Sequence, residues 1–174
     1  PHQTAAFYSR QPNEGPLGGT LLSGKELSYT NILDIDAAWR ATSSFSEPSV
    51  VIVKHLTPCG IAVGSTIAEA FPKALASDPL SAFGCAMGVN REVDDAFVES
   101  LGALLIDVLA APSFTPSALA TLSQKRKNCR LLQVPYPYDG SALEIRTVHR
   151  GFLVQRPDLG DPEGTLMKTV TNRV

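Results

Sequence analysis

Cysteine, charge and long apolar runs are all sparse in this sequence of 174 residues, and each absence excludes a class of protein. The three cysteines, Cys59, Cys85 and Cys129, are odd in number and far apart, which is typical of reduced thiols in a cytosolic protein. No uncharged apolar run approaches the roughly 18 residues that a membrane helix needs. The N-terminus also lacks the pattern of a signal peptide. We therefore expect a cytoplasmic protein with no membrane partner.

A strong charge of either sign is missing as well. Fifteen basic and seventeen acidic residues leave a net charge of -2, which does not attract nucleic acid or anionic lipid to the surface as a whole. Any anionic ligand must therefore be held by a local cluster, and no nucleic-acid partner is expected. Hydrophobic residues make up 44% of the chain and charged residues 18%, as in a globular domain with a well-buried core. The chain starts at Pro1 without Met, and we expect it to be part of a larger protein.

The most informative stretch is an apolar run that ends at a cation and an imidazole. Residues 50–53 are four consecutive β-branched residues, a pattern typical of a strand buried on both faces inside an α/β sheet. Lys54 and His55 follow directly, and Pro58 and Gly60 are expected to turn the chain. Ligands collect beyond the carboxyl ends of strands in open α/β sheets, so both side chains fall where a site is expected. The alternative is a strand end that meets water.

Strand and helix patterns alternate along the rest of the chain. Capping residues or helical periodicity predict four helix starts: near Asp34 and after Thr66, Asp94 and Thr115. The second helix should be kinked or start late, because Pro72 falls inside it. Further buried strands are predicted at 85–89, 105–110 and 129–134, and a hairpin at 143–148 and 151–155 is predicted on the edge of the main sheet. This alternation predicts a three-layer α/β sandwich.

Two other kinds of site are considered at the same stretch. Pro58-Cys59 is similar to half of a zinc-deaminase motif, but Ala62 stands where a second cysteine is needed and His55 is not followed by x-Glu. A lone cysteine cannot complete a zinc site, so metal-dependent deamination is excluded. Cys59 could act as a nucleophile beside His55, although no third group that would orient the imidazole is evident. A Walker A loop and a Gly-x-Gly-x-x-Gly motif after a strand are both missing.

An acidic residue inside a predicted apolar strand has two interpretations. Asp107 interrupts the run at 105–110. A carboxylate in an apolar setting must be paired or hydrogen-bonded, so it could accept hydrogen bonds from a bound ligand. Alternatively, it lies at the edge of the strand in water. The residues alone slightly favour the second interpretation.

Three segments carry a resemblance to a known family. GKELSYTNILD at 24–34, VKHLTPCGIAVG at 53–64 and DPLSAFG at 78–84 resemble the AICAR transformylase domain of the bifunctional AICAR formyltransferase/IMP cyclohydrolase family. The match runs through nearly the whole chain in the same order. The resemblance implies a cytidine-deaminase-like fold without zinc, and formyl transfer from 10-formyltetrahydrofolate to the 5-amino group of AICAR in purine biosynthesis.

The same resemblance assigns roles to residues of this chain. Lys54 and His55 would be the catalytic pair. The expected substrate-binding residues, on the AICAR side, are Asn31, Asp107, Thr57 and Pro58. The expected residues on the folate side are Leu80, Ser81, Phe83 and Gly84. No metal ligand is implied.

The chemistry agrees with the catalytic pair. The amine of AICAR is conjugated and a poor nucleophile, so a base must take its proton, and the unperturbed pKa of His near 6.5 suits that task. A cation such as Lys54 would stabilise charge on the formyl oxygen. Consecutive strand residues point to opposite faces, so both side chains reach one ligand only if the strand ends at or before Lys54.

The chain also departs from the family pattern. Thr57 stands where bacterial members more often have Asn, and the Arg expected to hold the nucleotide phosphate would precede Pro1. We expect residues 1–174 to be about one of two transformylase subdomains, with 135–174 leading to the other. The full-length protein is expected to contain an IMP cyclohydrolase domain and to be a homodimer. We predict that the 174-residue chain is inactive alone. The alternative is a folate- or nucleotide-binding module without turnover.

Overall fold

The structure, a computed structural model, describes residues 3–9, 11–12, 14–138, 143–158, 160–161, 164–166 and 168–170. Both chain ends, on which the prediction of a larger protein depends, fall outside these ranges. The chain divides into two compact units, Pro1–Tyr138 and Asp139–Val174. The elements of the first unit are η1 (Pro16–Gly18), β1 (Thr20–Ser23), α1 (Tyr29–Ser43), β2 (Ser49–Lys54), β3 (Thr57–Val63), α2 (Ile67–Ser77), β4 (Cys85–Val89), α3 (Asp95–Ser100), β5 (Ile106–Ala111), α4 (Pro116–Lys125) and β6 (Arg130–Gln133). The second unit contains β7 (Glu144–Val148) and β8 (Gly151–Gln155).

The first unit is built on a six-stranded mixed sheet. Its strand order is β1-β6-β5-β4-β2-β3. β4, β5 and β6 run parallel to one another, whereas β2 is antiparallel to both of its neighbours, β4 and β3. The end of β2 therefore lies beside the start of β4, with Val53 paired to Ala86. Lys54 lies at the carboxyl end of its own strand, as expected, but at the amino ends of the parallel strands β4, β5 and β6, so the rule for ligand sites in parallel sheets does not apply to it.

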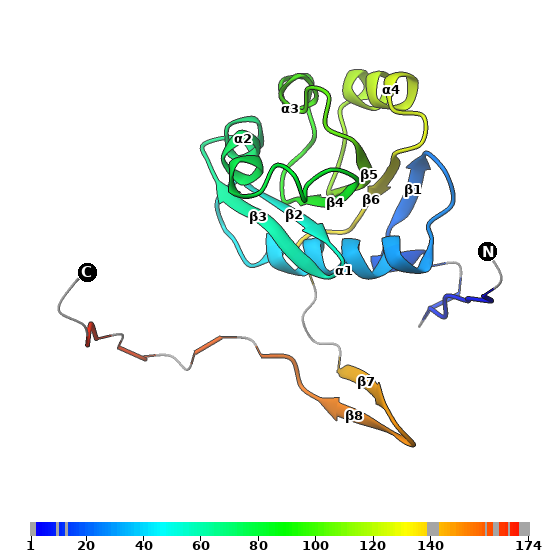
Figure 1. Cartoon of the computed structure of the whole chain (residues 1–174), viewed down its shortest axis with the longest axis vertical. Coiled ribbons are helices and arrows are strands. Elements are labelled where there is room, and N and C mark those ends of the chain that lie inside the picture. Colours follow the sequence, from blue (N-terminus) through cyan, green and yellow to red (C-terminus); the bar gives the residue numbers. More distant parts are fainter. Residues whose placement is uncertain are drawn as a thin grey trace. The chain divides into compact units, whose positions relative to one another are not determined.

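Helices cover both faces of this sheet, which confirms the predicted three-layer α/β sandwich. α1 lies on one face, and α2, α3 and α4 lie on the other (Figure 1). The side chains of β2 alternate between these layers, as a strand requires. Val50 and Ile52 belong to the core beneath α2, α3 and α4, and Val51 and Val53 belong to the core against α1. All four are fully buried, so the prediction of an interior strand is confirmed.

Helix starts follow the local capping chemistry. The side chains of Thr66, Asp94 and Thr115 accept hydrogen bonds from backbone N–H groups three residues later, as predicted. α1 begins at Tyr29 instead of near Asp34, because Ser28 and Asn31 form a reciprocal capping box before it. α2 begins at Ile67 and continues through Pro72, so the predicted late start is wrong. No helix within the described ranges has the length and apolar character to span a membrane.

The predicted hairpin forms, but it is not part of the main sheet. β7 and β8 pair antiparallel from Glu144 to Gln155 and make a two-stranded sheet of their own. The edge positions of the main sheet are held instead by β1 and β3, which the sequence patterns did not indicate. β3 contains both Pro58 and Gly60, so these residues lie within a strand and do not form the turn.

Gly60 explains how β3 can pack against α2. A Cβ atom at this position would lie 1.9 Å from the carbonyl oxygen of Ala74, which is closer than any side chain allows. Glycine in a strand commonly marks such a close approach of another backbone. The absence of a side chain at Gly60 therefore sets the spacing between the edge strand and the helix that covers it.

Candidate functional site

The predicted catalytic pair lies at a two-residue turn between β2 and β3. β2 ends at Lys54, β3 starts at Thr57, and these two residues pair across the turn. His55 and Leu56 form the turn, with φ angles of 54° and 63°. Two positive φ angles in a two-residue loop are typical of the type I′ hairpin, which matches the twist of the flanking strands. The strand therefore ends at Lys54, as the sequence argument required.

The two side chains open into one cavity. It has a volume of about 330 Å³ and lies where β2 ends and β3 begins, beside the loop after α2. The residues that line it are Lys54, His55, Thr57, Pro58, Cys59, Asp78 and Ser81. Lys54 and His55 are thus brought together, and neither is sealed in the core. Sequence reasoning did not assign a role to Asp78, although it ends a predicted helix and is the first residue of the DPLSAFG segment.

Lys54 connects this cavity to the loop that precedes β4. Its Nζ donates a hydrogen bond of 2.5 Å to the carbonyl oxygen of Phe83. The loop is held at its other side by Asp78, whose Oδ1 accepts a hydrogen bond of 3.0 Å from the Ser81 N–H. Hydrogen bonds from Ser81 also hold the pKa of the Asp78 carboxyl below its ordinary value. The cavity therefore contains an ionised carboxylate at neutral pH, together with the amine of Lys54.

Cys59 is poorly suited to nucleophilic catalysis in this setting. Burial raises the pKa of its thiol, Asp78 raises it further, and Lys54 opposes the shift. The thiolate is the nucleophilic form of cysteine, so a raised pKa reduces reactivity at neutral pH. The cavity favours the interpretation in which Lys54 and His55 are the reactive groups.

Of the four residues expected on the AICAR side, Thr57 and Pro58 line this cavity, whereas Asn31 and Asp107 do not. Asn31 is 9% exposed, and its Oδ1 accepts a hydrogen bond from the N–H of Ser28 at the start of α1. Asp107 is half-buried as the second residue of β5. Cys85, the first residue of β4, pairs with Ile106, the first residue of β5. Asp107 therefore lies one strand beyond β4, near the same ends of the strands as Lys54.

The guanidinium group of Arg130, which the sequence analysis missed, donates hydrogen bonds near these strand ends. Arg130, the first residue of β6, donates hydrogen bonds from Nε to the carbonyl oxygen of Glu26 and from Nη1 to that of Asp107. It therefore links the loop before α1 to the start of β5. Nothing in the local sequence indicated this contact, because Arg130 and Glu26 are 104 residues apart.

The predicted folate-side residues are divided between the cavity and its surroundings. Ser81 lines the cavity, whereas Leu80, Phe83 and Gly84 do not. The side chains of Leu80 and Phe83 are 88% and 59% exposed. This leaves two apolar side chains in water on the loop to which Lys54 is bonded.

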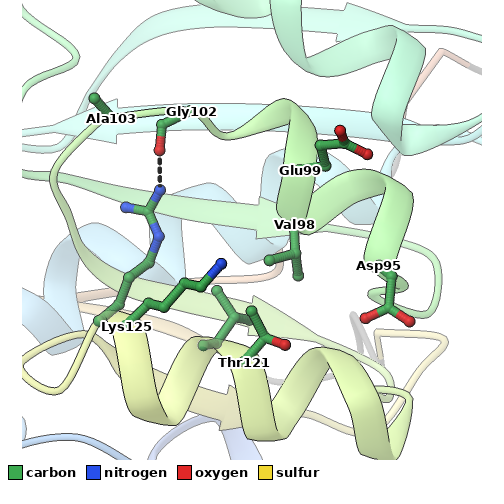
Figure 2. A pocket seen from close by; sticks show the side chains of 9 residues that line it. Asp95, Val98, Glu99, Gly102, Ala103, Thr121 and Lys125 are labelled. Carbon is green, nitrogen blue, oxygen red and sulfur yellow. Dashed lines mark hydrogen bonds between the residues drawn. The ribbon is translucent and has the colours of Figure 1, made fainter.

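A larger cavity, of about 660 Å³, lies between α3 and α4 (Figure 2). It contains none of the predicted site residues. Two of its four charged lining residues are hydrogen-bonded within the protein: Arg126 donates to the carbonyl oxygens of Gly102 and Leu104, and Asp95 accepts a hydrogen bond from Ser117. Among the residues that the structure describes, no three His, Cys, Asp or Glu side chains are grouped as a metal site requires.

Comparison with known proteins shows what kind of protein carries this arrangement. The curated bifunctional purine biosynthesis protein PurH of Shouchella clausii (strain KSM-K16) is 44% identical over 169 residues, which cover 95% of this chain and 33% of the relative. The chain thus spans about a third of the length of this relative. The family model of the AICARFT/IMPCHase bienzyme matches residues 1–174. The resemblance carried by the three sequence segments is therefore confirmed, and the chain belongs to the AICARFT/IMPCHase bienzyme family.

Proposed function

We propose that this chain provides the Lys54–His55 part of a formyltransferase site in purine biosynthesis. One observation carries the proposal: Lys54 and His55 are adjacent in sequence and yet line the same cavity. In a continuous strand they would point to opposite faces of the sheet. The turn after Lys54 removes that restriction, which supports a role for the amine and the imidazole toward one ligand.

The reaction is the transfer of a formyl group from 10-formyltetrahydrofolate to the 5-amino group of AICAR. The amine nitrogen bonds to the formyl carbon, and the bond from that carbon to N10 of the folate breaks. His55 accepts the proton that the amine loses, because an imidazole is a competent base near neutral pH. Lys54 stabilises the negative charge that develops on the formyl oxygen. The departing nitrogen takes up a proton, which yields FAICAR and tetrahydrofolate.

The two substrates are assigned to different sides of the pair. AICAR would lie toward residues of α1, of β3 and of the start of β5: Asn31, Thr57, Pro58 and Asp107. The folate would lie toward the loop before β4: Leu80, Ser81, Phe83 and Gly84. Exposed apolar side chains at Leu80 and Phe83 support this side, because a flat aromatic ligand would cover them.

Other parts of a longer protein would complete the site. The PurH relative is about three times as long as the matched region, so its remaining length can hold a second transformylase subdomain, itself cytidine-deaminase-like, and an IMP cyclohydrolase domain. Residues 135–174 would connect to the second subdomain, and the assembled protein would be a cytoplasmic homodimer. On this proposal the 174-residue chain has little or no activity alone.

The test replaces each member of the pair in the full-length protein. His55→Ala and Lys54→Ala should each lower kcat by about 10² to 10⁴, the usual contribution of general acid–base or charge-stabilising groups. AICAR affinity, measured by calorimetry, should change little. His149→Ala is the matched control, because His149 is an exposed histidine beside β7 and should leave kcat unchanged. Full turnover in His55→Ala would refute the proposal, and binding without turnover in the unmodified protein would favour a binding module.

A further inference from the structure

The turn that presents His55 has an unusual backbone for its sequence. Both His55 and Leu56 adopt left-handed φ angles, 54° and 63°. Type I′ turns normally place Asn, Asp or Gly at these two positions, because other residues meet steric conflict there. Histidine tolerates this region better than most residues, but leucine does not. Another interaction must therefore compensate for the conformation of the His55–Leu56 turn.

The carboxylate of Asp34 makes that interaction. Its Oδ2 accepts a hydrogen bond of 3.1 Å from the N–H of His55, and its Oδ1 accepts one of 2.8 Å from the N–H of Leu56. Successive N–H groups that point to one side form a concave site for an anion, and here a side chain of the same protein occupies it. Hydrogen bonds to an ionised acceptor are stronger than those between neutral groups.

The packing of α1 fixes the position of this carboxylate. Asp34 is 8% exposed, and the next residue, Ile35, is fully buried in the core between α1 and the sheet. That core also contains Val51 and Val53 of β2, the strand that leads into the turn. Apolar side chains thus pack the helix and the strand together, and the hydrogen bonds of the Asp34 carboxylate go to the backbone of the turn.

We infer that Asp34 is a positioning residue, which holds the His55–Leu56 turn in its left-handed conformation and thereby directs the imidazole into the cavity with Lys54. Without the carboxylate, the turn can relax toward right-handed φ angles, which splay the strands of a two-residue hairpin. The direction of the His55 side chain then changes, while Lys54 stays at the end of β2, a strand that is also held by its pairing with β4 through Val53 and Ala86. The catalytic consequence rests on the proposed function, whereas the effect on the turn does not.

Two variants remove the carboxylate in different ways. Asp34→Ala removes both acceptors. Asp34→Asn keeps the shape but places an amide N–H₂ against one of the two backbone donors. Asp36→Asn is the matched control, because Asp36 lies on the same helix and is only partly buried, with its carboxylate paired to Arg40 and not to the turn.

The first measurement is amide hydrogen exchange in the 174-residue chain. The sequence has only three histidines, so selective ¹⁵N-histidine labelling gives few signals, among them that of His55. Exchange of the His55 amide should become about tenfold faster or more in Asp34→Ala and Asp34→Asn, as expected for the loss of a hydrogen bond to a charged acceptor. Asp36→Asn should leave it unchanged. Unchanged exchange in either Asp34 variant, with the remaining spectrum native-like, would overturn the inference.

The second measurement separates positioning from general structural damage. In the full-length protein, Asp34→Asn should lower kcat by about 10- to 100-fold with little change in KM for AICAR, since small displacements of reacting groups have effects of that size. Adding Leu56→Gly should restore part of the lost kcat, because glycine adopts positive φ without steric conflict. Faster exchange with unchanged kcat would overturn the positioning role. If the unmodified protein shows no turnover, the proposed function fails, and hydrogen exchange alone decides whether Asp34 holds the turn.

Discussion

Among the polar residues of the first unit, Asn90 should be the one whose substitution lowers the free energy of unfolding most. It follows β4 and is 1% exposed. Its Oδ1 accepts a hydrogen bond of 2.8 Å from the N–H of Ser49, the first residue of β2. Its Nδ2 donates to the carbonyl oxygens of Phe45 and Glu47 at 2.9 and 2.8 Å. One side chain thus fixes the loop between α1 and β2 and the start of the strand that ends at Lys54.

The expected cost of Asn90→Leu follows from these contacts. Leucine is similar in shape but removes the partner of four backbone groups, the N–H of Ser49 and the carbonyl oxygens of Thr42, Phe45 and Glu47. The carbonyl oxygen of Thr42 keeps a hydrogen bond from the Ser49 hydroxyl, so three of these groups lose their side-chain partner without such a replacement. The N–H of Ser49 is fully buried, and an unsatisfied buried donor costs about 1–3 kcal/mol. The carbonyl groups of Phe45 and Glu47 lie in partly exposed residues, so water can replace some of their lost bonding. We expect the free energy of unfolding to fall by about 2–4 kcal/mol in total.

Asn90→Asp provides a second variant with a pH dependence. It keeps the acceptor for Ser49 but directs carboxylate oxygen at the carbonyl groups of Phe45 and Glu47. Burial beside these carbonyls should raise the pKa of the new carboxyl above its ordinary value of about 4. With a raised pKa, the free energy of unfolding of the Asn90→Asp variant is highest while the new carboxyl is protonated, and it falls as pH rises through the folded-state pKa. Asn90→Asp should therefore be closer to the wild type at pH 4.5 than at pH 7.

Urea unfolding followed by circular dichroism measures both effects. The reasoning predicts that Asn90→Leu lowers the unfolding midpoint at either pH by a similar amount, whereas the deficit of Asn90→Asp grows with pH. A loss below about 0.5 kcal/mol for Asn90→Leu, the size of an ordinary surface substitution, would refute the assigned role of the side chain.

Two further predictions concern packing and buried thiols. Gly60→Ala should destabilise the chain by about 1–3 kcal/mol, because the added methyl group collides with the carbonyl oxygen of Ala74, and an unchanged Tm would contradict this contact. Burial raises the pKa of Cys85 and of Cys129 to about 12. In the unfolded chain these thiols ionise near pH 9, whereas in the folded chain they stay protonated until about pH 12. The free energy of unfolding is therefore unaffected by the two thiols below pH 9 and falls as pH rises from 9 toward 12, by roughly 1 kcal/mol per pH unit for each thiol. Replacing both cysteines with Ala should flatten the decline in urea midpoint between pH 9 and pH 11, and an identical slope would show that other groups cause it.

Local chemistry explains which parts of the fold could be predicted from the sequence. The four β-branched residues before Lys54 identified the interior strand β2, because a strand buried on both faces needs a continuous apolar run. Thr66, Asp94 and Thr115 marked helix starts, because a capping hydrogen bond spans only three residues. These signals depend on neighbours in sequence, and the structure agrees with them.

The parts that could not be predicted depend on distant residues. The turn at His55–Leu56 contains no Gly, Asn or Pro, and the group that holds it, Asp34, precedes it by 21 residues. β3 contains Pro58 and Gly60 and looks like a loop, because an edge strand needs neither a full ladder of hydrogen bonds nor two apolar faces. The direction of β2 relative to β4 also follows from this hairpin and not from any local pattern.

The candidate site could be predicted only where its residues have a local sequence signal. Lys54 and His55 were visible as polar residues directly after an apolar run. Asp78 joins their cavity only through the fold, at the end of α2. The bracing contact from Arg130 connects segments that are more than one hundred residues apart and carries no sequence signal.

A crystal structure of the full-length protein with bound AICAR tests the central claim most directly. The account predicts that the 5-amino nitrogen lies within hydrogen-bond distance, about 3 Å, of the His55 imidazole, and that Lys54 reaches the same side of the ligand. Leu56 should retain a positive φ angle in the complex. AICAR bound in the cavity between α3 and α4, or a His55 imidazole directed away from the nucleotide, would contradict it.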